Sequence, residues 1–206
     1  MKLNTLTSPM SRRARIAILA AWLAIAQVPF GLPTRSRAED VAVPISIQFP
    51  LLLKILQFDK NLYERSGERI VIGVAYQGRF RASLRAKEEM LQAAEDQAPV
   101  TVAGLPVDIV AVDIERENLS AALKSMDIDV VYVTPLRSVD IRSITKCTRA
   151  RGITSMTGVD EYVRSGISVG VGIWQEKPSV MVNLAASKAE GTNFSSRLLS
   201  LARRVE

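Results

Sequence analysis

The sequence contains no histidine and a single cysteine, Cys147. Without histidine the chain lacks the commonest general base and the commonest metal ligand, which excludes histidine-dependent hydrolase sites and histidine-ligated zinc sites. One cysteine cannot form a disulfide within the chain. Its spacing from Ile144 places Cys147 on the apolar side of an expected helix, so we expect a buried thiol. A reactive thiol, or a bridge between two chains, is the alternative.

Acidic residues are absent from the first 38 positions, which have the pattern of a cleavable signal peptide. Four basic residues precede an uncharged apolar run from 16 to 30, and Ser36-Arg37-Ala38 supplies the small-x-small pattern of a cleavage site. The alternative is a membrane anchor, but a span needs about 20 apolar residues and this run is shorter. We therefore expect residues 1–38 to be a signal peptide and residues 39–206 to form the exported domain.

The expected exported domain also lacks a net charge. Positions 1–38 hold six of the 27 basic residues and none of the 21 acidic residues, so positions 39–206 carry 21 of each. The basic pI therefore belongs largely to the N-terminal segment, and a nucleic-acid partner is not supported. The remaining length suits one domain with a full hydrophobic core.

The fold class is indicated by a short apolar run at 128–133, which is rich in β-branched residues and closed by Thr134-Pro135. Such a run is typical of a strand that is buried on both faces. Apolar residues recur at helical spacing before it, over 119–126, and after it, over 141–147. This alternation predicts a mostly parallel sheet with helices on both sides, and a second strand–helix unit lies at 70–94.

The remaining segments complete a single three-layer α/β domain. Val41 to Phe49 are expected to be extended, with Pro50 opening a first helix that ends near Ser66-Gly67. Further strands are expected at 107–112 and 153–156. The segments 167–174 and 179–184 predict a C-terminal antiparallel hairpin, followed by a last helix from Phe194 to Val205.

The turn after the first expected strand is a candidate site for an anionic ligand. A glycine between a strand and a helix lets backbone N–H groups converge, and parallel sheets bind ligands at the carboxyl ends of their strands. The residues of this candidate site are Gly78, Arg79, Arg81, Arg85 and Arg137. One glycine falls short of a phosphate-binding motif, so a solvated helix face carrying these arginines is the favoured alternative.

The first helix is a candidate protein interface, because its apolar positions spread wider than the stripe needed for one core contact. These residues are Leu51, Leu52, Leu53, Ile55, Leu56 and Phe58. Cover by a second chain predicts a homodimer, and cover by a signalling partner is equally consistent. The alternative is that the last helix covers them within one chain.

No pattern points to catalysis. Pairs of acidic residues flank strand ends, which is the ordinary place for solvated charge, and Ser195-Ser196 is typical of a helix cap. Neither a histidine partner nor nucleophile-elbow glycines accompany these serines. We therefore expect no enzymatic activity, no cofactor and no metal site.

Two segments near the C-terminus resemble the ending of the YfiR family. Residues 180–186 form a strand running into Asn-Leu and an alanine pair, and residues 194–202 contain the Ser-Ser-x-Leu-Leu-x-Leu-Ala pattern of a terminal helix. The likeness extends over about residues 50–206. Two features differ from many members: Gln57 to Leu62 replace a Trp-Pro segment, and no internal disulfide can form.

The resemblance implies a function. YfiR proteins are small exported α/β proteins, typified by periplasmic repressors of membrane-bound diguanylate cyclases. It implies a non-enzymatic, homodimeric regulator that binds the periplasmic part of an inner-membrane signalling protein and acts on cyclic di-GMP and biofilm formation. A periplasmic small-ligand binding domain, using the candidate anion site and the loop Thr134 to Arg137, is the alternative.

Overall fold

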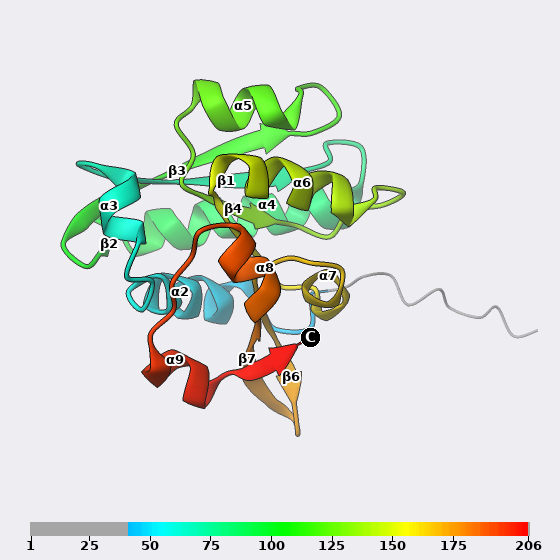
Figure 1. Cartoon of the computed structure of the whole chain (residues 1–206). Coiled ribbons are helices and arrows are strands. Elements are labelled where there is room, and N and C mark those ends of the chain that lie inside the picture. Colours follow the sequence, from blue (N-terminus) through cyan, green and yellow to red (C-terminus); the bar gives the residue numbers. More distant parts are fainter. Residues whose placement is uncertain (1–40, 206) are drawn as a thin grey trace, which may run out of the picture. The chain divides into compact units, whose positions relative to one another are not determined.

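A computed structural model describes residues 41–205 and shows one eight-stranded sheet with helices around it (Figure 1). The strands are β1 (Ile70–Tyr76), β2 (Thr101–Val102), β3 (Leu105–Asp113), β4 (Val130–Val133), β5 (Thr154–Thr157), β6 (Val169–Trp174), β7 (Lys177–Asn183) and β8 (Arg203–Val205). Their order in the sheet is β2-β3-β1-β4-β5-β6-β7-β8. The five strands from β3 to β6 are parallel, and β7 returns antiparallel to β6. The expected α/β class with a C-terminal hairpin is therefore confirmed.

The helices form the layers on the two faces of this sheet. They are α2 (Ile45–Leu56), α3 (Leu62–Ser66), α4 (Arg81–Asp96), α5 (Leu119–Ser125), α6 (Ile141–Arg151), α7 (Asp160–Arg164), α8 (Leu184–Ala189) and α9 (Ser196–Leu201). Apolar side chains of α2, α4 and α9 pack with Val130 and Tyr132 of β4, while those of α5 and α6 pack with Val131 and Val133. Alternate residues of the central strand thus enter two separate cores, as period-two geometry requires.

The N-terminal segment corrects one expectation. Residues 45–49 are helical rather than extended, and Pro50 lies inside α2 instead of at its start. Gln48 explains the difference, because its buried side chain donates to Val43 O at 2.6 Å and accepts from Tyr132 Oη at 3.0 Å. These tertiary bonds and the burial of Ile45 and Phe49 stabilise the early turn despite the backbone donor that Pro50 lacks.

The C-terminal segment corrects a second expectation from the sequence. The last helix, α9, ends at Leu201, and the chain then forms β8, which runs parallel to β7 at the edge of the sheet. Leu201 is 74 % exposed, whereas Val205 is buried as a strand residue. The expected apolar stripe from Phe194 to Val205 therefore belongs to two elements.

Two sequence-based expectations concern export and the single thiol. The proposed signal peptide at 1–38 lies outside the described residues and stays a prediction. Within residues 41–205, no helix combines the length and the hydropathy needed to cross a bilayer. Cys147 is only partly buried and packs against the core beneath α5 and α6.

Candidate functional site

The candidate anion site lies where the sequence placed it, at the carboxyl ends of β1 and β4. Gln77 joins the two strand ends: its Oε1 accepts from Arg137 N at 2.6 Å and its Nε2 donates to Arg137 O at 3.2 Å. The backbone donors of the turn are occupied, because Gly78 N bonds to Asp113 Oδ1 at 3.4 Å and Arg79 N to Glu115 Oε2 at 2.8 Å. Carboxylates of the chain itself therefore take the positions that an external anion would need.

The arginine side chains of this candidate site are exposed, and one of them is already paired within its own helix. Arg79, Arg81 and Arg137 are exposed, and Arg85 pairs with Glu89 on its own helix at 2.7 Å. The hollow beside Gly78 holds only about 150 Å³. A Cβ at Gly78 would lie 2.7 Å from Asp113 Oδ2, so the glycine is explained by the close approach of that carboxylate. The geometry favours the solvated-face alternative over a ligand site.

The candidate interface on α2 is largely inside the molecule. Leu52, Leu53, Ile55 and Leu56 are 4 %, 8 %, 3 % and 1 % exposed, and the two others, Leu51 and Phe58, are partly buried against the same core. Phe194 and Leu198 belong to that core as well. The width of this apolar face is therefore accounted for within one chain, and the argument that it needs an intermolecular cover is corrected. The homodimer itself stays a prediction.

A different surface is open to a partner, namely the outer edge of β3. Its short neighbour β2 pairs only with Leu105 and Pro106, and Val107 N adds one further bond to Val100 O at 3.0 Å. Beyond Val107 no strand of the described residues lies along this edge. An unpaired edge is a template for strand addition.

The orientation of the backbone along β3 follows from alternation. Val107 N faces β2, whereas Ile114 N bonds to Tyr76 O of β1. Because backbone groups alternate along a strand, the N–H and C=O groups of the odd-numbered residues of β3 face away from β1. The N–H and C=O groups of Ile109 and Ala111 therefore point away from β1 and have no partner within residues 41–205. The side chain of Ile109 is partly buried and packs against the core, which anchors the middle of β3.

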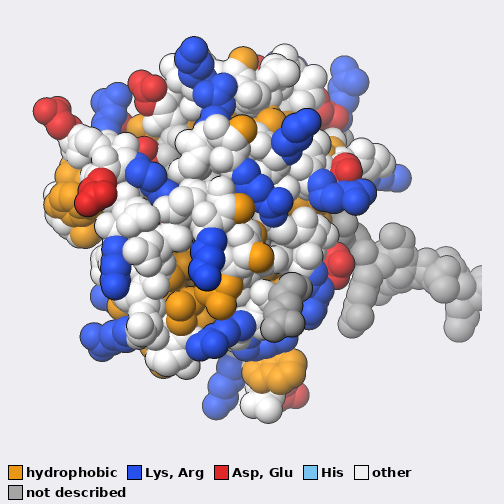
Figure 2. All heavy atoms as spheres, viewed as in Figure 1, with side chains coloured by type: hydrophobic (Ala, Val, Ile, Leu, Met, Phe, Trp, Pro, Cys, Tyr) orange, Lys and Arg blue, Asp and Glu red, His pale blue; other side chains and the backbone are white. Residues whose placement is uncertain are grey.

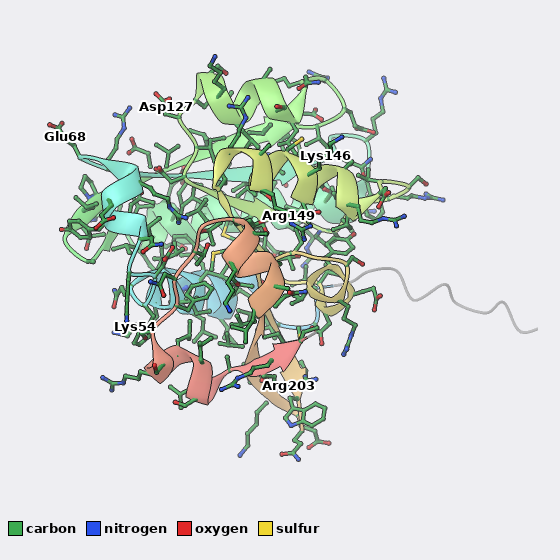
Figure 3. The ribbon with its side chains drawn as sticks, viewed as in Figure 1. Lys54, Glu68, Asp127, Lys146, Arg149 and Arg203 are labelled. Carbon is green, nitrogen blue, oxygen red and sulfur yellow. The ribbon has the colours of Figure 1, made fainter. Side chains whose placement is uncertain are left out.

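A second hollow, with a volume of about 710 Å³, lies at the opposite end of the parallel strands. Its charged lining comprises Arg65, Arg69, Lys124 and Arg151 together with Glu68, Asp127 and Asp129. Figure 3 shows Glu68 and Asp127 at this end of the molecule. Burial raises the pKa of Asp129, although its carboxylate accepts from Val71 N at 2.8 Å. The mixture of charges suits a small charged or zwitterionic molecule.

A comparison with known families decides the relationship. The sequence profile of the YfiR/HmsC-like family matches residues 47–203. The chain belongs to the YfiR/HmsC-like family. The resemblance inferred from residues 180–186 and 194–202 is thereby confirmed, and these residues of the YfiR/HmsC-like chain form β7, the start of α8 and the segment around α9.

Solved structures share the fold of this YfiR/HmsC-like chain at low identity. One is an ABC domain in complex with L-Trp from Streptococcus pneumonia, at 16 % identity and a TM-score of 0.55, covering 79 % of this chain and 62 % of that chain. Another is a conserved domain protein from Vibrio cholerae, at 14 % identity and a TM-score of 0.51, covering 79 % and 60 %. The chain thus spans about three fifths of each, and such identities show the fold alone. No curated protein matches the sequence.

Sequence reasoning gave no function to either of the two features that the structure leaves open in this YfiR/HmsC-like domain. A signal for the β3 edge was present, because a two-residue strand at 101–102 cannot cover a strand of nine residues. The hollow gave no comparable signal, since its lining comes from segments at 65–71, 123–129 and 151–153. Loop residues at the amino ends of strands carry no motif for such a site.

Proposed function

We propose that this protein is an exported regulator, acting in the periplasm, which binds the periplasmic region of an inner-membrane signalling protein and represses it. The observation that carries the proposal is membership of the YfiR/HmsC-like family over residues 47–203. The proposed partner is a diguanylate cyclase, so that binding lowers cyclic di-GMP. Repression follows when the regulator binds the inactive state of its partner more tightly than the active state.

The β3 edge is the proposed docking site. An extended segment of the partner would add to the sheet as a further strand, with main-chain bonds to Ile109 and Ala111. The half-buried side chains along the edge give such a strand an apolar surface to cover. Strand addition needs no catalytic group, which agrees with a regulator that acts by binding.

Deleting the gene is expected to raise cellular cyclic di-GMP and biofilm mass, because the partner loses the ligand that favours its inactive state. Nucleotide extraction with mass spectrometry measures the first, and restoring the gene in trans is the control. Unchanged nucleotide levels, combined with failure of periplasmic crosslinking to recover any inner-membrane protein, would refute the proposal.

Replacing Ala111 by proline is expected to weaken partner binding by about tenfold or more, since it removes one outward main-chain donor and obstructs the incoming strand. Proline is tolerated on an edge strand where the lost N–H faces solvent, so circular dichroism should stay unchanged. Ala111→Thr retains the N–H and serves as the matched control. Equal crosslinking yields for both variants would exclude this edge as the docking site.

The hollow of about 710 Å³ favours a second candidate function, the binding of a small charged ligand that signals to the partner. A thermal-shift screen of anionic and zwitterionic metabolites is expected to find a stabilising compound, because a ligand that binds only the folded state raises the melting temperature. Arg151→Gln, at the edge of the hollow, should weaken that shift. Arg81→Gln should not, because it lies beside the turn whose backbone donors already bond to Asp113 and Glu115. A screen without any shift would leave the hollow without this role.

A further inference from the structure

Basic charge is concentrated at the C-terminal end of the fold. Residues 165–205 carry five basic side chains and only two acidic ones, although positions 39–206 are balanced. One of the two acids, Glu190, is fully buried, so Glu176 at the tip of the β6–β7 hairpin is the single exposed acid of this stretch. The basic residues are Lys177, Lys188, Arg197, Arg203 and Arg204.

Large apolar side chains are exposed in the same region. Ile173 and Trp174, which end β6, are 39 % and 51 % exposed, and Leu201, which ends α9, is 74 % exposed. The guanidinium of Arg203 stacks on the Trp174 ring with its Cζ 3.9 Å from the ring centroid. This cation–π contact ties the hairpin tip to β8 and holds the ring in an exposed position.

Figure 1 places α9, β8 and the tip of the β6–β7 hairpin, which carry most of these residues, at one end of the molecule. Figure 2 shows apolar side chains among several basic ones in the lower part of the view, where Figure 1 has α9, β8 and the tip of the β6–β7 hairpin. Figure 3 shows Arg203 beside the hairpin, with Lys54 of α2 toward the same end and Glu68 and Asp127 far from it. The end is projecting rather than hollow, because β6 and β7 extend past the helices.

We propose that this projecting basic end docks on the surface of an anionic lipid bilayer. Trp174 and Leu201 would enter the headgroup region, where amphipathic aromatic rings are favoured, and the arginines and Lys177 would contact lipid phosphates. Charge complementarity supports a lipid rather than a protein surface. Lysine is depleted from protein–protein interfaces, although arginine and tryptophan are enriched there. Single apolar anchors surrounded by cations are typical of proteins that lie on membranes.

The inference does not depend on the identity of the signalling partner. Two or three apolar anchors give weak, reversible attachment, to which each basic residue adds about a fivefold increase in binding. Glu176 opposes this attraction, and so does Asp160, whose carboxylate lies against Gly172 of β6 and interacts with Arg203. Docking would hold the protein close to any partner in that membrane and raise its effective concentration there.

Tryptophan fluorescence tests the proposal directly, because Trp22 and Trp174 are the only tryptophans in the sequence. In a Trp22→Phe background, the full chain is mixed with vesicles of phosphatidylglycerol or of phosphatidylcholine. We expect a blue shift of Trp174 emission and co-sedimentation with phosphatidylglycerol only, both weakened by salt. All variants keep residues 1–40 otherwise unchanged, so any binding by that segment is common to them.

Three substitutions sharpen the result. Arg204→Gln is expected to weaken binding about fivefold, Glu176→Gln to strengthen it about fivefold, and Arg142→Gln, an exposed arginine at the start of α6, to leave it unchanged. Equal binding to both vesicle types, or equal affinities for all three variants, would overturn the proposal. A blue shift caused by soluble polyglutamate and not by vesicles would also overturn it and assign this end to an acidic protein.

Discussion

Replacing Glu190 by alanine is expected to lower the free energy of unfolding by about 3 kcal/mol. Glu190 is fully buried, and four donors surround its carboxylate. Thr148 Oγ1 of α6 donates at 2.5 Å, Ser155 of β5 donates through N at 2.8 Å and Oγ at 2.7 Å, and Ser168 Oγ donates from the residue before β6. One side chain thus joins α6, β5 and the start of β6.

The size of the effect follows from what alanine leaves behind. A buried donor without an acceptor costs about 1–3 kcal/mol. Some of these donors can turn elsewhere, since Thr148 Oγ1 also lies 3.1 Å from Thr145 O, so the four losses do not add in full. A loss of this size is a large part of a typical stability of about 5–15 kcal/mol. It should lower the melting temperature by about 6–12 °C for a domain of this length.

The variant Glu190→Gln is the matched control, because it keeps the size and one acceptor oxygen but cannot ionise. Its free energy of unfolding is expected to lie within about 1 kcal/mol of that of the wild type near neutral pH. Burial raises the pKa of Glu190 above its ordinary value of 4.5, and the hydrogen bonds from Ser168, Thr148 and Ser155 only partly offset this. The folded state therefore binds this proton more tightly than the unfolded state does.

The sign of the pH dependence follows from this difference in proton affinity between the folded and unfolded states. The stability that this raised pKa contributes is fully present below pH 4.5 and is lost as the pH rises through the pKa of the folded state. The wild type should therefore become less stable, relative to Glu190→Gln, as the pH increases. Urea unfolding of both proteins at about pH 5 and about pH 8 measures the difference. The raised pKa values of Asp129 and Asp160 act equally in both proteins and cancel. Parallel stability curves for the two proteins would contradict this account.

The fold was predictable from the sequence where burial left a pattern. The doubly buried β4 appears as an unbroken β-branched run, and α6 ends at Gly152, whose left-handed φ of 66° is typical of a glycine at a helix C-terminus. The start of α2 was not predictable by local rules, since Pro50 argues against a helix there. Its stability comes from Gln48 bonding to Tyr132, 84 positions later.

The sites were less predictable, because their contacts also join residues that are far apart in the sequence. The sequence placed Gly78 and Arg137 correctly at one edge of the sheet, but it could not show that Asp113 and Glu115, about 35 positions later, occupy the donors of that turn. Glu190 gave no signal at all, because its partners lie 22 to 42 positions away and are ordinary serines and threonines. Polar groups that satisfy one another across the chain leave no periodicity for sequence analysis to detect.

Replacing Arg65 by methionine is expected to lower the free energy of unfolding by about 3–5 kcal/mol, because it leaves the carboxylate of Asp59 buried without a counter-charge. The side chain of Asp59 is fully buried, and its Oδ2 lies 2.8 Å from Arg65 Nη2. The same Arg65 atom donates to Thr154 Oγ1 at 2.9 Å, and Arg65 Nη1 donates to the backbone O of Glu190 at 3.1 Å. The guanidinium therefore holds α3 against β5 and the end of α8.

Asp59 extends the same network to the C-terminal segment. Its Oδ1 accepts from Asn61 N at 3.1 Å and from Asn193 N at 2.9 Å, and the backbone of Asp59 forms a bridge with Phe194. The link after α2 is thus fastened to the link before α9. Loosening it should expose the core beneath α9, so the variant should also gain binding of a hydrophobic dye before global unfolding.

A double-mutant cycle separates the ion pair from its surroundings. Asp59→Asn combined with Arg65→Met removes both charges, and its loss is expected to be smaller than the sum of the two single losses. Arg69→Met is the control, because Arg69 and Asp108 form an exposed pair at 3.5 Å whose loss should change stability by no more than about 0.5 kcal/mol. Urea unfolding of the wild type, the two single variants and the double variant gives the coupling energy. Strict additivity of the single losses would mean that Arg65 stabilises the fold through its packing and its bonds to Thr154 and Glu190, rather than through the charge of Asp59.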